Sequence, residues 1–242
     1  KRLPALPPPF LQIPESTMFC DIPQILWHAD DSNKNVPIFS CDIHQLPIKN
    51  ESKVGSIESE RFLLATAGAD GEIHLFGIRC LTSSSSPLPE FIQALIGHEN
   101  SVNVVRFSPC GLKLASSDDR GTIAIWSVKC VEDWCDTNIN PSRRSISCST
   151  REIYDLAWSP SGNHLASGGM DKITRIWDTN RTKVVNSISD HQQCIQGVAW
   201  DPMEKFIATQ SSDRTMRTYT YSLEISKNAS IPKVVVKCDK TV

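Results

Sequence analysis

Serine, histidine and aspartate, the residue types of a hydrolytic triad, recur along this sequence at regular spacing. In three segments a Ser or Thr stands four residues before an Asp, and an aromatic residue stands six residues after it. A nucleophilic enzyme needs a single exposed Ser with a base and an oxyanion hole, whereas each of these sets belongs to a turn that repeats. The sequence contains no G-x-S-x-G, Walker A, H-E-x-x-H or calcium-loop motif. We therefore expect a non-enzymatic protein without catalytic residues, metal site or cofactor.

Three segments, which are the second, third and fourth copies, superimpose on one another as a repeat, and a fainter first copy runs over 37–43, 61–67 and 72–78. Each of the three opens with an alternating run that ends in a Ser-Pro or Asp-Pro turn, at residues 102–107, 153–158 and 195–200. A second short run, a polar turn and a third run ending in an aromatic residue follow, which is typical of antiparallel strands. Trp158 to Trp200 spans 42 residues, and so does Trp177 to Tyr219. A period of about 40 to 45 residues with four strands indicates a propeller.

Family marks appear at equivalent places in these copies: Gly97-His98, Asp190-His191, the three turn Asp residues and Ile176-Trp177-Asp178. The chain resembles a WD-repeat β-propeller. We predict an all-β fold with about four blades of an expected seven, so that the chain would be a fragment of a longer protein. We expect residues 1–17 to form a flexible Pro-rich leader and residues 18–242 to form the partial propeller. The predicted blades are approximately residues 36–96, 98–150, 151–189 and 191–238.

The resemblance implies a buried relay in which a turn Asp, a loop His, a strand Ser or Thr and a strand Trp satisfy one another's hydrogen bonds. No copy keeps all four members. In the second copy Arg120 stands at the Asp position, so either Asp119 substitutes or this relay is absent. In the third copy Ser149 stands where the His belongs, and in the first copy no His is clear. The remaining expected members are Thr66, Asp70, Phe76, His98, Ser116, Trp126, Ser167, Asp171, Trp177, His191, Thr209, Asp213 and Tyr219.

The composition is that of a globular protein, with 25 basic and 27 acidic residues, 40% hydrophobic and 21% charged. It excludes collagen-like, coiled-coil and wholly disordered classes. No apolar run approaches the roughly 20 residues that cross a bilayer, and the balanced charge does not point to nucleic acid. Prolines at positions 4, 7, 8, 9 and 14 argue against a secretory signal. Nine cysteines without C-x-x-C spacing favour a reducing, intracellular compartment.

Propellers bind partners through the rim formed by the start of each first strand and by the residue before each turn Asp. These side chains leave the sheet edge toward solvent, so an exposed aromatic or Met there is a candidate hot spot. The alternative is that Phe39 and Met170 pack against neighbouring blades. By register the rim comprises Phe39, Ala69, Asn103, Asp119, Tyr154, Met170, Gln196 and Ser212.

Two further features lie between the repeats. Arg143-Arg144, in the long insertion 129–150, would either meet an acidic partner or a phosphate or form a solvated loop pair. Ser86, in the run 82–87, would either be a proline-directed phosphorylation site or belong to a plain linker.

Beyond the general repeat, the runs His98 to Pro109, 153–158, 196–202 and 209–214 resemble the WD-repeat B subunits of chromatin assembly factor 1. The segment Met18 to His28 resembles the N-terminus of that family, so that Met18 would be the native start. The related HIRA-type histone chaperones share the Trp-Asp-Pro and Asp-Arg elements and are the second interpretation. A substrate receptor of a cullin ubiquitin ligase is a third, although Asn180 stands where its W-D-x-R motif requires Arg.

The resemblance implies a nuclear scaffold that, with the other chromatin assembly factor subunits, deposits histones H3/H4 during DNA replication and repair. It also implies contact with the anti-silencing histone chaperone through a tail beyond the propeller, which this sequence does not contain. Neither a membrane nor direct sequence-specific nucleic-acid binding is implied.

Overall fold

The computed structural model describes residues 28, 35–47, 60–80, 89–148, 151–224 and 233–241. The predicted leader 1–17, Ser86 and Ser149 lie outside these residues. Within them, no helix is long and apolar enough to cross a membrane.

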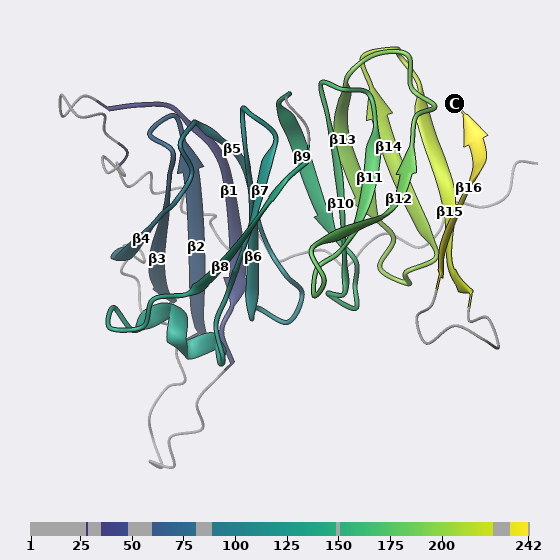
Figure 1. The fold of residues 1–242 in the computed structure, drawn as a ribbon. Coiled ribbons are helices and arrows are strands. Elements are labelled where there is room, and N and C mark those ends of the chain that lie inside the picture. Colours follow the sequence, from purple (N-terminus) through teal and green to yellow (C-terminus); the bar gives the residue numbers. More distant parts are fainter. Residues whose placement is uncertain are drawn as a thin grey trace, which may run out of the picture.

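Four antiparallel sheets of four strands follow one another along the chain (Figure 1). Blade 1 contains β1 (Ile38–Gln45), β2 (Glu60–Gly68), β3 (Glu72–Cys80) and β4 (Glu90–Ile96). Blade 2 contains β5 (Val102–Phe107), β6 (Lys113–Asp118), β7 (Thr122–Ser127) and β8 (Ser142–Ser147). Blade 3 contains β9 (Ile153–Trp158), β10 (His164–Gly169), β11 (Thr174–Asp178) and β12 (Lys183–Ile188). Blade 4 contains β13 (Ile195–Trp200), β14 (Phe206–Ser211), β15 (Met216–Glu224) and β16 (Lys233–Thr241).

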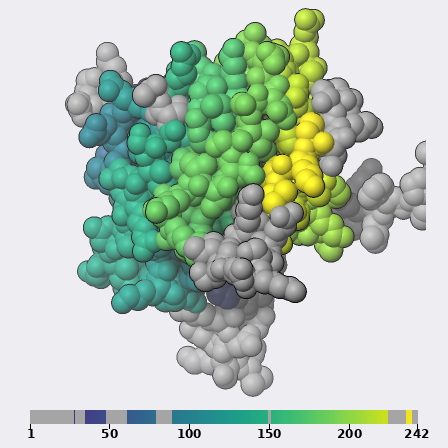
Figure 2. All heavy atoms as spheres, turned by 45° about the vertical axis from the view of Figure 1, so that its right-hand side comes forward, coloured from purple at the N-terminus to yellow at the C-terminus, as the bar shows by residue number. Residues whose placement is uncertain are grey.

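This arrangement confirms the all-β propeller prediction. In every blade the strands are hydrogen-bonded in chain order, so the alternating first runs of the repeats form one edge strand of each sheet. These first strands contact one another from blade to blade, β1 with β5, β5 with β9 and β9 with β13. They are therefore the inner strands, and β4, β8, β12 and β16 are the outer ones. In the space-filling view the described parts of successive blades form one continuous body (Figure 2).

The core lies between the blades, because each sheet buries side chains on both faces. One cluster joins Leu63 and Leu75 of blade 1 to Phe107 and Trp126 of blade 2. The second joins blades 2 and 3, and the third joins Ile176 of blade 3 to blade 4. A period-two pattern alone would leave one face of each sheet exposed to solvent. The apolar residues on the second face therefore reflect the packing of one blade on the next.

Polar side chains also connect the inner strands. Ser40 Oγ accepts the backbone N–H of Val105 at 3.2 Å, and Asp155 Oδ2 accepts that of Val198 at 3.0 Å. The two acceptors occupy the same position in β1 and β9. Arg106, between them in β5, donates to Ser40 Oγ at 3.0 Å and to Asp155 Oδ1 at 3.0 Å. One guanidinium thereby links three consecutive blades.

The insertion in blade 2 contains a short helix and the fourth strand of the blade. The helix is a 3-10 helix, η1 (Val131–Cys135), and it precedes β8. Trp134 is fully buried, its Nε1 donates to the carbonyl of Gly111 at 2.7 Å, and its ring meets Phe107 edge-on. Arg143 and Arg144, expected in a loop, lie in strand β8. This strand pairs with β7 along its whole length, which explains why the backbone that carries the two arginines is held in place.

The turn between the second and third strands of each blade requires a left-handed residue. Gly71 and Gly121 supply it in blades 1 and 2, with φ of 77° and 76°. Lys172 and Arg214 adopt φ of 69° and 68° at the equivalent place in blades 3 and 4. These two residues accept a conformation that Gly adopts at less cost, and the preceding Asp side chain bonds across the turn.

Candidate functional site

The repeated Ser, His and Asp residues form hydrogen-bond relays inside the blades. In blade 2, Trp126 Nε1 donates to Ser116 Oγ at 3.0 Å, and Ser116 Oγ lies 2.7 Å from His98 Nε2. His98 Nδ1 lies 2.9 Å from Asp118 Oδ2, and Asp118 Oδ1 accepts the backbone N–H of Thr122 at 2.8 Å. Because a carboxylate only accepts, Nδ1 carries the histidine proton and the Ser116 hydroxyl donates to Nε2. The three side-chain hydrogen bonds of the relay are therefore all donated in the same direction, from the Trp126 indole toward the turn.

This geometry corrects the expectation for the second copy. The relay is present, and its acid is Asp118 rather than Asp119, at the end of β6. Asp118 is 2% exposed, whereas Asp119 is half-buried and lies outside the relay. Burial works to raise the pKa of Asp118, but hydrogen bonds from His98 and from the N–H of Thr122 outweigh it and lower that pKa. Spacing from Ser116 to its acid is two residues here instead of four, which sequence register did not reveal.

The first copy also has a relay, and its histidine is His28. His28 Nδ1 lies 2.5 Å from Asp70 Oδ2, and Nε2 lies 2.8 Å from Thr66 Oγ1. The expectation of no clear His is wrong for a simple reason. His98 and His191 stand four residues before their first strands, whereas His28 stands ten residues before β1. A search for a His upstream of the first strand at any distance would have found it.

In blades 3 and 4, other residue types occupy some of the relay positions. In blade 3, Trp177 Nε1 donates to Ser167 Oγ at 2.9 Å, but Asp171 pairs with Arg175 rather than with a histidine. Cys148 Sγ lies 4.0 Å from Ser167 Oγ, and burial raises the pKa of this thiol to about 11, so it is neutral. In blade 4, His191 lies 2.9 Å from Asp213 and 2.8 Å from Thr209, with Tyr219 buried in the Trp position.

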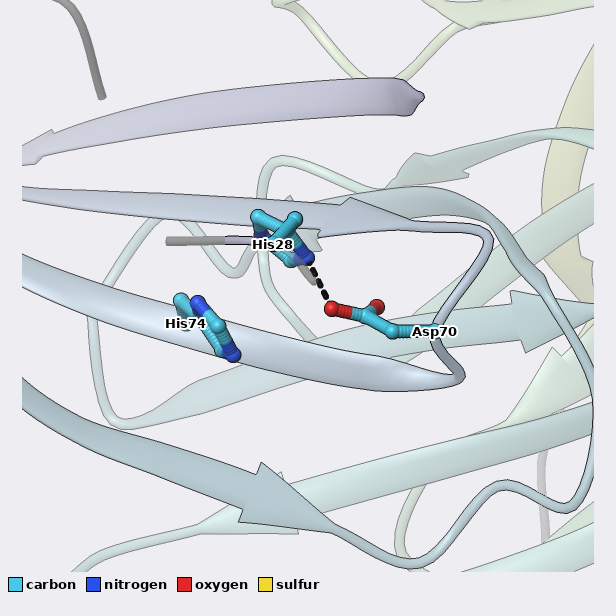
Figure 3. A group of neighbouring side chains, drawn as sticks. All are labelled: His28, Asp70 and His74. Atoms are coloured by element: carbon cyan, nitrogen blue, oxygen red, sulfur yellow. Dashed lines mark hydrogen bonds and ion pairs between the residues drawn. The ribbon is translucent and has the colours of Figure 1, made fainter. Parts of the chain in front are cut away.

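A pair of stacked histidines adjoins the first relay. The rings of His28 and His74 lie 3.9 Å apart at 18°, beside Asp70 (Figure 3). The three side chains offer ligand atoms within 4.8 Å of one another, as a metal site would. A metal would lie about 2 Å from each ligating nitrogen, in the plane of its ring. The lone pairs of nearly parallel stacked rings do not converge on such a point, and both nitrogens of His28 are already hydrogen-bonded. We assign the group to the relay.

The expected rim residues lie where the inner strands begin and where the second strands end. Phe39 is 50% exposed and Met170 38%, and Gln196 and Ser212 are exposed and bonded to each other at 3.1 Å. Each residue before a turn is held by the same backbone bond to the residue before the first strand. These bonds are Ala69 to Pro37, Asp119 to Ser101, Met170 to Glu152 and Ser212 to Cys194.

Tyr154 lies on this rim between residues of blades 2 and 4. It is half-buried in β9, and burial followed by a hydrogen bond with Glu152 raises its pKa, so the phenol is neutral. Asp119 of blade 2 and Cys194 of blade 4 lie close enough to raise this pKa further. Asn103, half-buried, donates to the carbonyl of Ile153 at 3.4 Å. The structure thus brings Asp119, Tyr154 and Met170 into one neighbourhood bridging adjacent blades. Phe39 lies apart in blade 1.

Four-stranded blades joined through their inner strands, with a complete Trp-Ser-His-Asp relay in blade 2 and partial relays in the other three, define a β-propeller of the WD-repeat type. The chain belongs to the CAF1B/HIR1 beta-propeller domain family, whose model matches residues 18–241.

Several curated relatives carry chromatin-related names. The chromatin assembly factor 1 FAS2 homolog of rice is 32% identical over 197 residues, covering 81% of this chain and 35% of the relative. The B subunit of chromatin assembly factor 1 from chicken is 29% identical, covering 81% of this chain and 34% of the relative. Protein HIR1 of Kluyveromyces lactis is 28% identical, covering 88% of this chain and 25% of the relative. The chain spans about a third of the length of the rice and chicken relatives.

Proposed function

We propose that this protein is a non-enzymatic scaffold in a histone chaperone complex, acting in the nucleus as the B subunit of chromatin assembly factor 1. Its role would be the deposition of histones H3/H4 during replication-coupled and repair-coupled nucleosome assembly. The observation that carries the proposal is the family match along residues 18–241, together with relatives in several organisms that are named as this B subunit. The partners would be the other subunits of that factor and the histones.

The structure supports a scaffold role in a specific way. The histidines of the relays in blades 1, 2 and 4 use both ring nitrogens for internal bonds, so none is free to serve as a base. The rim carries Tyr154 and Met170 beside the carboxylates of Glu152 and Asp119. An aromatic ring beside an exposed Met suits a protein partner.

A second candidate function is replication-independent histone deposition of the HIR1 type. The matches to HIR1 proteins of Kluyveromyces lactis and Aspergillus oryzae favour it, at 28% and 26% identity.

The deciding experiment is affinity purification of the full-length endogenous protein from nuclei of replicating cells, followed by mass spectrometry. We expect stoichiometric recovery of the large chromatin assembly subunit with core histones. Recovery of HIR-complex partners instead would establish the second candidate. Recovery of ubiquitin-ligase adaptors without histones would overturn both.

The rim is tested in the same purification. Replacing Tyr154 and Gln196 together with Lys should abolish partner recovery without unfolding the chain, because both side chains leave the sheet edge. A matched control places Lys at Gln45 and Ser187, which are exposed in β1 and β12. Partner recovery by the rim variant equal to that by the control would contradict the assignment.

A further inference from the structure

The relay histidine of blade 1 comes from outside the repeat. The histidines of the second and fourth relays stand four residues before their first strands, whereas His28 stands ten residues before β1. Within the described residues, three hydrogen bonds hold His28 in place. Its ring nitrogens bond to Asp70 and Thr66, and its backbone carbonyl accepts the N–H of Val36 at 3.0 Å. The imidazole is therefore what attaches this residue to the sheet of blade 1.

This relay lies at the end of the row of blades. In blades 2 and 3 the relay Trp belongs to a core cluster shared with the preceding blade. No described blade precedes blade 1, and the ring of His74 stacks on His28 instead, at 3.9 Å and 18° (Figure 3). His74 in turn meets the ring of Phe91 edge-on at 5.6 Å, and Phe91 is 45% exposed. His28 itself is buried, but the path from it to solvent on this side passes two side chains.

Two carboxylates bond to the two stacked rings. Asp70 accepts from Nδ1 of His28, and Glu72 Oε2 lies 3.1 Å from Nε2 of His74. Since a carboxylate only accepts, Nε2 of His74 carries the proton and its Nδ1 is left with a lone pair. That Nδ1 is buried and has no hydrogen-bond partner. Departure of His28 would open this nitrogen to water, which offsets part of the cost of breaking the two ring bonds of His28.

An additional proton fits the docked His28 poorly. Nδ1 already carries the proton that it donates to Asp70, and Nε2 accepts from the hydroxyl of Thr66. A second proton would reverse the bond with Thr66 and place a charge 3.9 Å from the ring of His74. Burial and His74 lower the pKa of His28, while Asp70 and Glu72 act in the opposite direction, and the lowering prevails. A released histidine keeps an ordinary pKa of about 6.5.

We propose that His28 is an acid-sensitive latch, which docks on blade 1 at neutral pH and leaves it in mild acid. The released form binds a proton that the docked form does not, so lowering the pH through about 6.5 favours release. The contribution of the neutral imidazole to docking is fully present above this value and declines as the pH falls below it. The proposal is independent of the proposed function, because it concerns the relay face of blade 1 and not the rim.

Val36 provides a direct readout, because its N–H donates to the carbonyl of His28. The experiment measures amide hydrogen exchange of the whole chain at single-residue resolution between about pH 7 and 5.5, as a protection factor corrected for the intrinsic rate. The reference is the N–H of Leu46, which donates to the carbonyl of Arg61 at 2.8 Å just after β1. We expect the protection of Val36 to fall roughly tenfold, because release binds one proton, while Leu46 keeps its protection.

Three variants separate the latch from general acid unfolding. His28→Gln keeps an amide that can make the same two side-chain bonds but does not titrate, so its Val36 protection should not depend on pH. His74→Phe keeps a stacked ring that cannot take a charge, and should show a smaller fall than the unmodified chain. The matched control is His44→Gln, because burial also lowers the pKa of His44 but this ring packs on blade 2 rather than on His28. The control should fall as the unmodified chain does.

Constant protection of Val36 across this pH range in the unmodified chain would overturn the proposal. An equal fall at Leu46 would also overturn it, because blade 1 would then unfold as a whole. Where His28→Gln fails to dock at any pH, His74→Phe decides, and a fall equal to that of the unmodified chain rejects the latch.

Discussion

At the scale of single residues, the four relays show which chemistry the blade requires. The strand hydroxyl is buried and needs a hydrogen-bond partner, since an unmet polar group is costly, and in blades 2 and 3 a Trp indole also donates to it. His98 and His191 meet this need with an Asp behind them. In blade 3, Arg175 takes the Asp and Cys148 approaches the hydroxyl instead. Different residue types therefore occupy equivalent places in the blades, and the buried Tyr219 hydroxyl of blade 4 has no hydrogen-bond partner.

Replacing Asp118 by Ala should destabilise the chain by about 3 kcal/mol, because the buried His98 and the backbone N–H groups of Arg120 and Thr122 lose their acceptor. The neighbouring Asp119→Ala change should cost less than about 0.5 kcal/mol. Urea unfolding of both variants measures the difference. Equal costs for the two neighbours would contradict the assignment of Asp118 to the relay.

Lowered histidine pKa values predict a loss of stability in acid. Burial lowers the pKa of His28, His44 and His164, and for His28 the nearby His74 adds to the effect while Asp70 opposes it. Below pH about 6.5 the unfolded chain binds protons that the native histidines do not, so protons favour the unfolded state. We expect the free energy of unfolding to fall as the pH is lowered from neutral through this value.

The measurement is urea unfolding at a series of pH values. His164→Gln should flatten part of the dependence, because its unfolded form no longer takes up a proton. An unfolding free energy that stays constant from pH 7 to about 5.5 would show that these histidines titrate alike in both states.

At the scale of elements, the inner strands and the insertion of blade 2 hold adjacent blades together. Arg106 joins β1, β5 and β9 through Ser40 and Asp155, and η1 adds Trp134 to the core between blades 1 and 2. The carbonyl of Trp134 accepts from Gln93 of β4 at 3.1 Å while its indole bonds to Gly111. The insertion therefore bridges two blades, and Trp134 is the residue that attaches it to both.

Replacing Trp134 by Ala should cost about 3 to 5 kcal/mol, because a fully buried indole is removed from the first core cluster. Trp134→Phe keeps most of the packing but loses the bond to Gly111, so it should cost less. Thr137→Ala, an exposed change in the same insertion, serves as the control. Chemical denaturation of the three variants gives the order, and a Trp134→Ala cost near that of Thr137→Ala would refute the anchoring role.

At the scale of the whole molecule, the blades contact in a row, from blade 1 to blade 4 (Figure 1). Blade 4 carries a hollow of about 270 Å³ lined by small and apolar residues, among them Ala199, Ala208 and Met216. Met216 is 46% exposed and Phe206, on the neighbouring strand, is also 46% exposed. Uncovered apolar sheet surface of this kind promotes association.

We expect the 242-residue chain on its own to self-associate, and Met216→Lys to reduce this by placing a charge in the hollow. Met203→Lys is the control, since Met203 is 71% exposed but lies in a turn outside the hollow. Size-exclusion chromatography with light scattering measures the oligomers. A sharp monomer peak with cooperative melting for the unmodified chain would contradict this prediction.

The repeat, the first three strands of each copy and the all-β propeller class can be read from the amino-acid sequence alone, whereas the pattern does not locate strand β8 in the insertion of blade 2. Alternation and turn residues act over a few neighbours, so they are legible without any tertiary contact. Most relay members could be placed the same way, because Thr66 and Asp70, or Thr209 and Asp213, keep a constant spacing across one hairpin.

Which distant residues complete each site depends on tertiary packing. His28 reaches Asp70 across 42 residues, Asp118 replaces the expected turn acid at a changed spacing, and Trp134 fills a core from within a polar insertion. Lys113 and Arg144 meet at Asn180 of the next blade. These contacts depend on how one blade packs on another or on where a loop returns, and packing selects partners by position in space rather than by separation along the chain.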